Sequence, residues 1–135
     1  IRMKTLLNLI TFVLLLASQP TLAEGHSPAV KRAVLTTSIE SREPTDNLNN
    51  TKLAKDASKI YFFTEVLNQA DKSVTHRWFR NGKLEAEVVL KIGSDRWRTY
   101  SSKNLDPTYH MGEWKVEAVD HKGKLLASET FSYNQ

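Results

Sequence analysis

The feature that most constrains the fold is a regular alternation of apolar and polar side chains beside an Asn-Gly pair. From Leu84 to Ile92, apolar residues occupy every second position, and most of the positions between them are charged. A period of two is typical of a β-strand with one buried face. Asn81-Gly82 precedes this stretch, and both residues tolerate the positive φ angles of a tight hairpin turn. The segment therefore predicts two antiparallel strands, over residues 74–80 and 84–92.

Further segments rich in β-branched and aromatic residues are separated by turn residues, which indicates a sandwich or a barrel. They lie at 33–39, 60–67, 96–100, 113–120 and 125–133. Seven short strands over about 100 residues favour an immunoglobulin-like antiparallel β-sandwich. The polar loop from 41 to 59 leaves a short helix open as an alternative to irregular chain. The sequence contains no cysteine, so the expected core rings Trp78, Trp97 and Trp114 must stabilise the domain without disulfides.

The N-terminal residues have the pattern of a secretory signal peptide. Lys4 precedes an apolar stretch from Leu6 to Ala17, and a helix breaker and small residues follow. This stretch is shorter than the roughly 20 residues that span a bilayer. We expect cleavage after Ala23, with an uncleaved N-terminal anchor as the alternative. The predicted organisation is a signal peptide at 1–23, a flexible lead-in at 24–31 and the β-sandwich domain at 32–135.

The predicted signal peptide places the mature domain outside the cytoplasm, in the periplasm or the extracellular space, with no membrane span after cleavage. The charge balance gives no reason to expect nucleic acid as a partner. The chain has 19 basic and 15 acidic residues, and two of the basic ones belong to the predicted signal peptide. The net charge of about +2 that is left lacks the strong excess typical of nucleic-acid-binding domains.

No cofactor and no metal are expected from the motifs in the chain. The four histidines are scattered and there is no cysteine, whereas zinc ligands usually occur at close spacings. The acidic residues of the loops do not follow a calcium-loop pattern. A phosphate-binding glycine loop and a nucleophile elbow are also absent from the sequence.

Two of the predicted strands are dense in basic and aromatic side chains, and they are the leading candidate for a binding face. Aromatic rings stack on sugars, and arginine binds carboxylates, phosphates or sulfates. The favoured alternative is structural: if strands 84–92 and 96–100 are neighbours, two arginines pair with Glu85 and Glu87, and the tryptophans are core. The candidate residues are His76, Arg77, Trp78, Arg80, Arg96, Trp97, Arg98, Tyr100 and Lys103.

Two further combinations contain groups that could act in catalysis, and we expect neither to be a catalytic site. Glu65 lies in an otherwise apolar strand, and with His76 and Arg77 it would supply acid and base groups. The favoured interpretation is a structural ion pair with a partly buried carboxylate. The stretch Tyr100-Ser101-Ser102-Lys103 differs from the Ser-x-x-Lys motif, and its hydroxyls are expected to form a turn. The chain is therefore predicted not to be an enzyme, and a small hydrolase is the least favoured alternative.

Several segments together resemble a bacterial family known as domain of unknown function 2914. The most specific blocks are Thr75-His76-Arg77-Trp78 and the stretch from Arg96 to Lys103, and similar stretches extend in order from Arg32 to Tyr133. The resemblance implies an envelope-associated β-sandwich module. It implies no activity, because none is established for the family, and so it transfers no catalytic residues.

These observations predict a non-catalytic binding or interaction module of the bacterial cell envelope. Its partner would be an envelope protein or a glycan. Binding of a carbohydrate or an anionic polymer through the basic and aromatic strands is the main alternative for its molecular role. The sequence leaves the oligomeric state open, since edge strands can also pair between copies.

Overall fold

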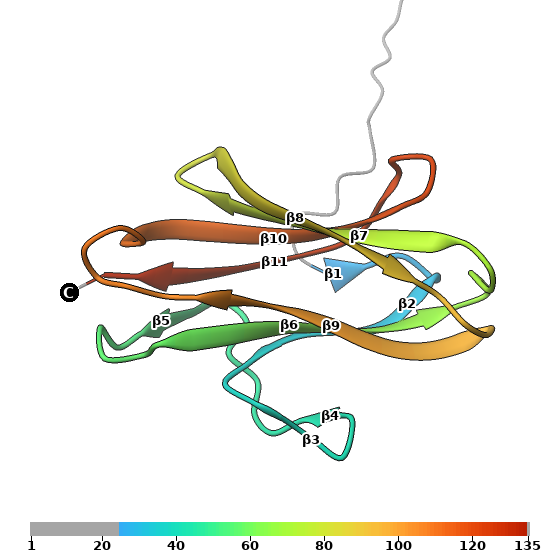
Figure 1. The fold of residues 1–135 in the computed structure, drawn as a ribbon, viewed down its shortest axis with the longest axis horizontal. Helices are drawn as coiled ribbons and strands as arrows, with labels where there is room; N and C mark the ends of the chain where they lie inside the picture. The colour runs from blue at the N-terminus through green and yellow to red at the C-terminus, as the bar shows by residue number, and fades with distance from the viewer. Residues whose placement is uncertain (1–24, 135) are drawn as a thin grey trace, which may run out of the picture.

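The computed structural model describes residues 25–134, and its regular structure consists of β-strands. Two sheets pack face to face, with the six-stranded sheet above the three-stranded one in Figure 1. The six-stranded sheet has the order β1-β11-β10-β7-β8, with β5 also beside β11, and the three-stranded sheet has the order β2-β6-β9. A separate hairpin, β3–β4, lies below the three-stranded sheet in Figure 1. The strands are β1 (Gly25–His26), β2 (Val30–Thr36), β3 (Ile39–Glu40), β4 (Glu43–Pro44), β5 (Thr51–Leu53), β6 (Lys59–Leu67), β7 (Ser73–Arg80), β8 (Lys83–Lys91), β9 (Arg96–Asn104), β10 (Gly112–Asp120) and β11 (Leu125–Tyr133).

The order of the long strands is that of an immunoglobulin-like sandwich. In chain order, the first, second and fifth long strands form one sheet, and the third, fourth, sixth and seventh form the other. Neighbouring long strands within each sheet are antiparallel. This arrangement corresponds to an A-B-E sheet packed against a G-F-C-C′ sheet. The fold class predicted from the sequence is confirmed.

The predicted strand positions agree with the structure best where the alternation is regular. β8 and β11 begin and end within one residue of their predicted bounds. β9 instead continues to Asn104, four residues beyond its predicted end, because the polar stretch from Ser101 still pairs with β6. The helix considered between 41 and 59 does not form, and β4, β5 and loop occupy this stretch.

The residues expected to be a flexible lead-in are paired with the larger sheet. Gly25 and His26 pair with Ser128 and Ala127 of β11. The N–H of Ser27 donates a hydrogen bond of 2.7 Å to the carbonyl of Leu126. From Gly25 onward this segment thus pairs with the larger sheet, because the free backbone groups of an edge strand can pair with a polar segment. The predicted signal peptide and Glu24 lie outside the described residues.

The core between the sheets is built around aromatic rings. Trp78 and Trp114 are both buried, and their ring centroids are 6.5 Å apart in an edge-on arrangement. Trp114 also stacks on Phe131, with the ring centroids 5.6 Å apart. The inward orientation predicted for Trp114 is confirmed. Trp97 is only partly buried and packs at the margin of the core.

The two outer edges of the larger sheet are very different. β11 is flanked by β1 at Ala127 and Ser128, and by the parallel strand β5 from Phe131 to Tyr133. β8 is the last strand on the other side of the sheet. Its charged residues Lys83 and Lys91 stand at its two ends, a common protection of free edges.

No helix long and apolar enough to cross a bilayer occurs in residues 25–134.

The turn between β7 and β8 gives a first testable prediction. Asn81 and Gly82 have φ angles of 51° and 83°, and Asn81 Oδ1 accepts a hydrogen bond of 2.9 Å from the N–H of Glu113. We expect Asn81→Ala to lower the free energy of unfolding by about 1–2 kcal/mol, because alanine adopts positive φ poorly and accepts no such bond. Asn81→Gly should lower the free energy of unfolding by about half as much, because glycine tolerates the positive φ angle. Urea denaturation measures both changes. Equal losses for both variants would contradict a role for the backbone angle.

Candidate functional site

The predicted binding residues do not form one face, because β7 and β9 belong to different sheets. Arg77 lies on the outer face of the larger sheet beside Glu87, and Arg80 lies at the end of β7 beside Glu85. His76 and Trp78 are buried between the sheets. Trp97 points inward, and Lys103 lies on the inner side of β9 opposite the buried Ile60. Arg96, Arg98 and Tyr100 alternate with the inward residues of β9 and so share the outer face of the three-stranded sheet.

The cross-strand ion pairs considered in the sequence are not the ones that form. Arg96 pairs with Glu65 at 2.6 Å, and Arg98 pairs with Glu43 at 2.6 Å. The expected partners Glu85 and Glu87 lie on β8, which is in the other sheet. β9 follows β8 along the chain but crosses to the smaller sheet and pairs with β6, so the two strands are not neighbours.

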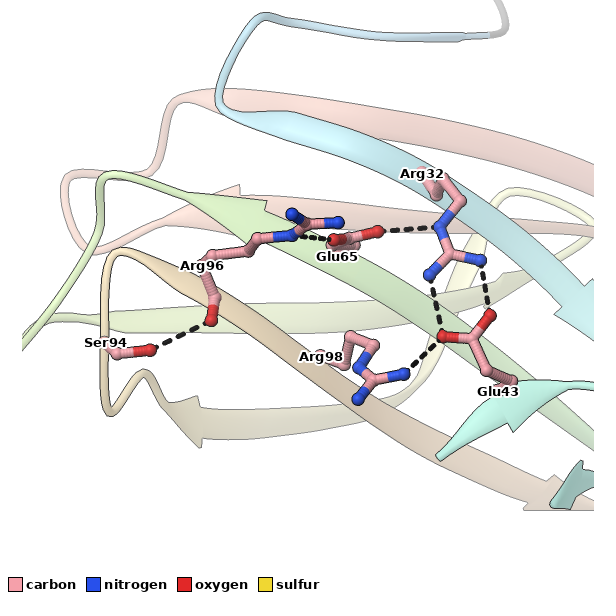
Figure 2. Close-up of polar contacts among 6 residues, drawn as sticks. All are labelled: Arg32, Glu43, Glu65, Ser94, Arg96 and Arg98. Atoms are coloured by element: carbon pink, nitrogen blue, oxygen red, sulfur yellow. Dashed lines mark hydrogen bonds and ion pairs between the residues drawn. The ribbon is translucent and has the colours of Figure 1, made fainter. Parts of the chain in front are cut away.

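Five charged side chains form a continuous row of ion pairs on the outer face of the three-stranded sheet (Figure 2). Glu65 accepts hydrogen bonds from the Nε atoms of Arg32 and Arg96, at 2.7 and 2.6 Å. Arg32 donates from Nη1 and Nη2 to both oxygens of Glu43, at 2.7 and 2.9 Å. Glu43 also accepts a hydrogen bond of 2.6 Å from Nη1 of Arg98. We call these residues, together with Arg42, the arginine–glutamate cluster.

The register of the sheet explains why these residues meet. Glu65 lies in the central strand β6, opposite Arg32 of β2 and Arg98 of β9. Its side chain is only 2% exposed. Burial alone would raise the pKa of Glu65, but the hydrogen bonds from Arg96 and Arg32 outweigh it and hold the pKa below its usual range. The partly buried, partnered carboxylate expected at Glu65 is therefore present, with partners other than His76 and Arg77.

The hairpin β3–β4 brings a second carboxylate into the cluster. Hydrogen bonds from Arg32 and then from Arg98 lower the pKa of Glu43 to about 2. The turn that precedes Glu43 has φ angles of 51° at Ser41 and 63° at Arg42. Residues other than glycine, asparagine and aspartate rarely adopt such angles, so this turn is strained. The Arg42 side chain has no hydrogen bond or ion pair to another residue within 25–134.

Two hollows with shared lining residues lie beside this hairpin and β9. The first, which we call the aromatic groove, has a volume of about 520 Å³. The second, the charged hollow, has a volume of about 320 Å³ and is lined by the arginine–glutamate cluster. Arg42 and Arg98 line both. The residues that line the aromatic groove are Ile39, Arg42, Phe63, Leu90, Lys91, Trp97, Arg98, Thr99 and Tyr100.

Tyr100 is the most accessible ring of the aromatic groove. Its residue is 46% exposed, and its ring meets Tyr61 edge-on with the centroids 5.8 Å apart. Phe63 lies opposite Tyr100 in the register and is buried. The outer face of β9 therefore presents a ring at Tyr100 and a guanidinium at Arg98, two residues apart on the same side of the strand.

His76 belongs to a separate polar network inside the sandwich. Its Nδ1 lies 2.6 Å from Ser101 Oγ, and its Nε2 lies 3.1 Å from Thr64 Oγ1. Trp78 Nε1 donates a bond of 3.1 Å to the same serine. Burial lowers the pKa of His76 to about 3, so the imidazole is neutral near pH 7. The network satisfies the polar groups of a buried region and has no access from solvent.

The catalytic combinations weighed in the sequence are not assembled. Glu65 points to the outer face of β6, whereas His76 lies on the inner side of the sheets and Arg77 faces away from both. Ser101 is directed into the core, where it binds His76 and Trp78, and so it does not form a turn. Among residues 25–134, no group of three or more histidines or carboxylates could hold a metal ion.

Sequence reasoning found Arg96, Arg98 and Tyr100 but missed their partners. Ile39, Arg42 and Glu43 come from a hairpin that carries no glycine or asparagine at its turn, so nothing marked it as a hairpin. The useful signal was Glu65, because a carboxylate in an apolar strand requires a cationic partner. That signal does not say which arginine along the chain supplies the charge.

The strand order and these contacts define an immunoglobulin-like β-sandwich domain with an aromatic and charged groove along the edge strand β9. Residues 71–133 match the model of the family described as "Protein of unknown function (DUF2914)". The resemblance found in the sequence is thereby confirmed over these residues. A comparison with curated protein sequences gives no match.

Two solved structures are similar to this chain at low sequence identity. The CARDB domain of a Pyrococcus furiosus protein, solved in complex with di-metal ions, is 12% identical, with a TM-score of 0.46. The similarity covers 87% of this chain and 100% of that one. An engineered protein is 13% identical, with a TM-score of 0.43. The similarity covers 77% of this chain but only 20% of the engineered chain.

Proposed function

We propose that this domain is a non-catalytic binding module of the bacterial cell envelope and that it binds its ligand in the aromatic groove. The observation that carries the proposal is the groove itself, about 520 Å³ in volume and lined by both aromatic and arginine side chains. Ligand sites commonly combine an apolar wall with a few convergent polar groups. The signal-peptide pattern in the sequence supports a location in the periplasm or outside the cell.

A carbohydrate is the ligand class that this groove favours. The Tyr100 ring is exposed, and the ring of Tyr61 beside it limits its movement. A rigid aromatic ring offers a large contact area to the apolar face of a sugar at a small cost in entropy. Arg98 and Arg42 supply hydrogen-bond donors at the same groove. The oligosaccharide would therefore lie along the outer face of β9.

The positions of the two groups that could act as acid and base, His76 and Glu65, support a non-catalytic role. His76 is buried and neutral, and Glu65 is held by Arg32 and Arg96 on the other side of the sheet. General acid–base catalysis requires both groups within reach of one substrate atom. The least favoured alternative from the sequence, a small hydrolase that uses Glu65 and His76, gains no support from this arrangement.

Removal of the exposed ring tests the proposal. We expect Tyr100→Ala to weaken retention on purified cell-wall polymer by about tenfold. The reason is that stacking of a sugar on an aromatic ring contributes about 1 kcal/mol to the binding free energy. Retention is measured by sedimentation with insoluble peptidoglycan and with acidic polysaccharide beads at low salt. Tyr109→Ala is the matched control, because Tyr109 is 69% exposed but lies outside the groove.

Two results would count against the proposal. One is retention of the Tyr100→Ala protein equal to that of the unchanged protein. The other is no retention of the unchanged protein on any polymer. Release of new reducing ends from the bound polymer would contradict the non-catalytic part. Circular dichroism of each variant confirms that the fold is kept.

A further inference from the structure

We infer that the charged hollow is a subsite for one anionic group of the ligand, so that an acidic oligosaccharide occupies it together with the aromatic groove. This inference rests on the proposed function and adds the chemical class of the ligand. The anionic group would be a carboxylate carried on a sugar ring. Arg42, Arg96 and Arg98 would hold it.

The first argument is the number of hydrogen-bond donors that the cluster leaves unused. Arg96 and Arg98 each donate one hydrogen bond to a glutamate, through Nε and Nη1 respectively. A guanidinium carries five N–H donors in a fixed planar arrangement. Arg42 donates none to the described residues. Donors from three arginines are therefore available around one hollow, and arginine pairs with carboxylates through two parallel hydrogen bonds.

The second argument is the charge around the hollow. Its lining contains four arginines and two glutamates, Glu43 and Glu65. Both carboxyl groups have pKa values below their usual range, so both are ionised near pH 7. The lining then carries a net charge of +2, which an anionic ligand would partly neutralise. Arg96 can reach such a ligand, because its side chain is 68% exposed.

The third argument is continuity between the two hollows. Arg98 and Arg42 line both of them. Arg98 and Tyr100 point to the same side of β9, and residues two apart in a strand are about 6.6 Å apart. This spacing is comparable to the length of one sugar residue. A ring stacked on Tyr100 can therefore place a carboxylate of the same or the next residue beside Arg98.

The fourth argument is the strained turn that presents Arg42. The positive φ angles at Ser41 and Arg42 persist although glycine or asparagine would adopt them at lower cost. Glu43, the next residue, is tied to β2 and β9 through Arg32 and Arg98. The ion pairs of Glu43 thus hold the hairpin in place, and Arg42 lines both hollows at its tip. Backbone strain of this kind is concentrated at ligand-binding sites.

The test compares a hexamer of galacturonic acid with its fully methyl-esterified form, which has the same backbone without the charge. By isothermal titration calorimetry at low salt, we expect the acidic hexamer to bind at least about tenfold more tightly. Arg42→Asn should remove most of this difference, since asparagine tolerates the left-handed backbone but lacks the guanidinium. The thermal unfolding temperature of this variant should not fall.

Two control variants separate the effect of the site from a general effect of charge. Arg77→Gln removes a guanidinium from the outer face of the other sheet and should leave both affinities unchanged. Arg42→Lys keeps the charge without the planar pair of donors and should keep only part of the preference for the acidic hexamer. If Arg77→Gln reduced the preference for the acidic hexamer as much as Arg42→Asn does, the proposed subsite would be contradicted.

The outcomes distinguish this inference from the proposed function. Equal affinity for the acidic and esterified hexamers, with both lost in Tyr100→Ala, overturns the anionic subsite and leaves the binding groove intact. Binding of neither hexamer by a protein that is retained on peptidoglycan also overturns the subsite alone. Binding of neither hexamer and no retention on any polymer overturns the proposed function and the inference with it.

Discussion

Glu65→Ala is expected to lower the free energy of unfolding by about 2–3 kcal/mol. The carboxylate is 2% exposed and accepts two short hydrogen bonds from arginines. Removing one member of a buried ion pair leaves the other without compensation and costs about 3–5 kcal/mol. The loss is placed below that range because Arg96 is well exposed and regains water, and because Arg32 keeps Glu43 as a partner. Urea denaturation at pH 7 measures the change.

Glu87→Ala is the matched control for this prediction. Glu87 also pairs with an arginine directly opposite in the sheet, Arg77, at 2.8 Å, but its side chain is 44% exposed. Exposed pairs contribute about 0–1 kcal/mol, so this variant should be nearly as stable as the unchanged protein. If Glu65→Ala and Glu87→Ala lowered the free energy of unfolding by similar small amounts, burial of Glu65 would not matter to stability.

Acidification from pH 7 to pH 4.5 is expected to lower the free energy of unfolding by about 2–3 kcal/mol through His76 alone. Histidine has a pKa of about 6.5 in an unfolded chain, and burial lowers the pKa of His76 to about 3 in the fold. Between these values the unfolded chain binds the proton more strongly, so stability falls as the pH falls. The slope approaches about 1.4 kcal/mol per pH unit within this window.

The histidine contribution can be isolated by keeping the pH above the range in which carboxylates titrate. The pKa values of Glu43 and Glu65 are lowered in the fold. The two carboxylates therefore stabilise the fold fully above about pH 4.3, the pKa of a glutamate in an unfolded chain. This stabilisation is lost only as the pH falls below that value. Urea denaturation at pH 7.0, 6.0 and 5.0, roughly spanning the histidine window, therefore reports mainly on histidine. His76→Gln should flatten the dependence, whereas His121→Gln, in an exposed turn, should keep it. An unchanged slope in His76→Gln would refute the assignment.

The sequence predicted strands well where side chains alternate, because burial on one face leaves a local pattern. Leu84 to Lys91 and Leu125 to Tyr133 are examples, and the Asn81-Gly82 turn indicated that β7 and β8 pair as a hairpin. Local patterns do not show which strands become neighbours. β9 pairs with β6, which ends some thirty residues earlier, and this non-local pairing decides the partners of every arginine on β9.

The candidate site was predicted only in part for the same reason. Arg98 and Tyr100 were identified by their chemistry, but Arg42 and Glu43 reach the site through a hairpin whose turn residues are Ser41 and Arg42. Nothing in such a turn resembles a preferred hairpin sequence. His76 was selected as a functional candidate, although its partners Thr64 and Ser101 make it a component of the core.

The unequal edges of the larger sheet limit how copies of this domain could associate. Because β1 and β5, the strands that flank β11, have only two and three residues, β8 is the long edge strand that this sheet offers to a second chain within residues 25–134. Pairing of β8 with β8 is isologous and uses the same surface of both molecules. Such a contact closes on itself, so pairing through β8 alone would give a two-fold dimer and not a fibre.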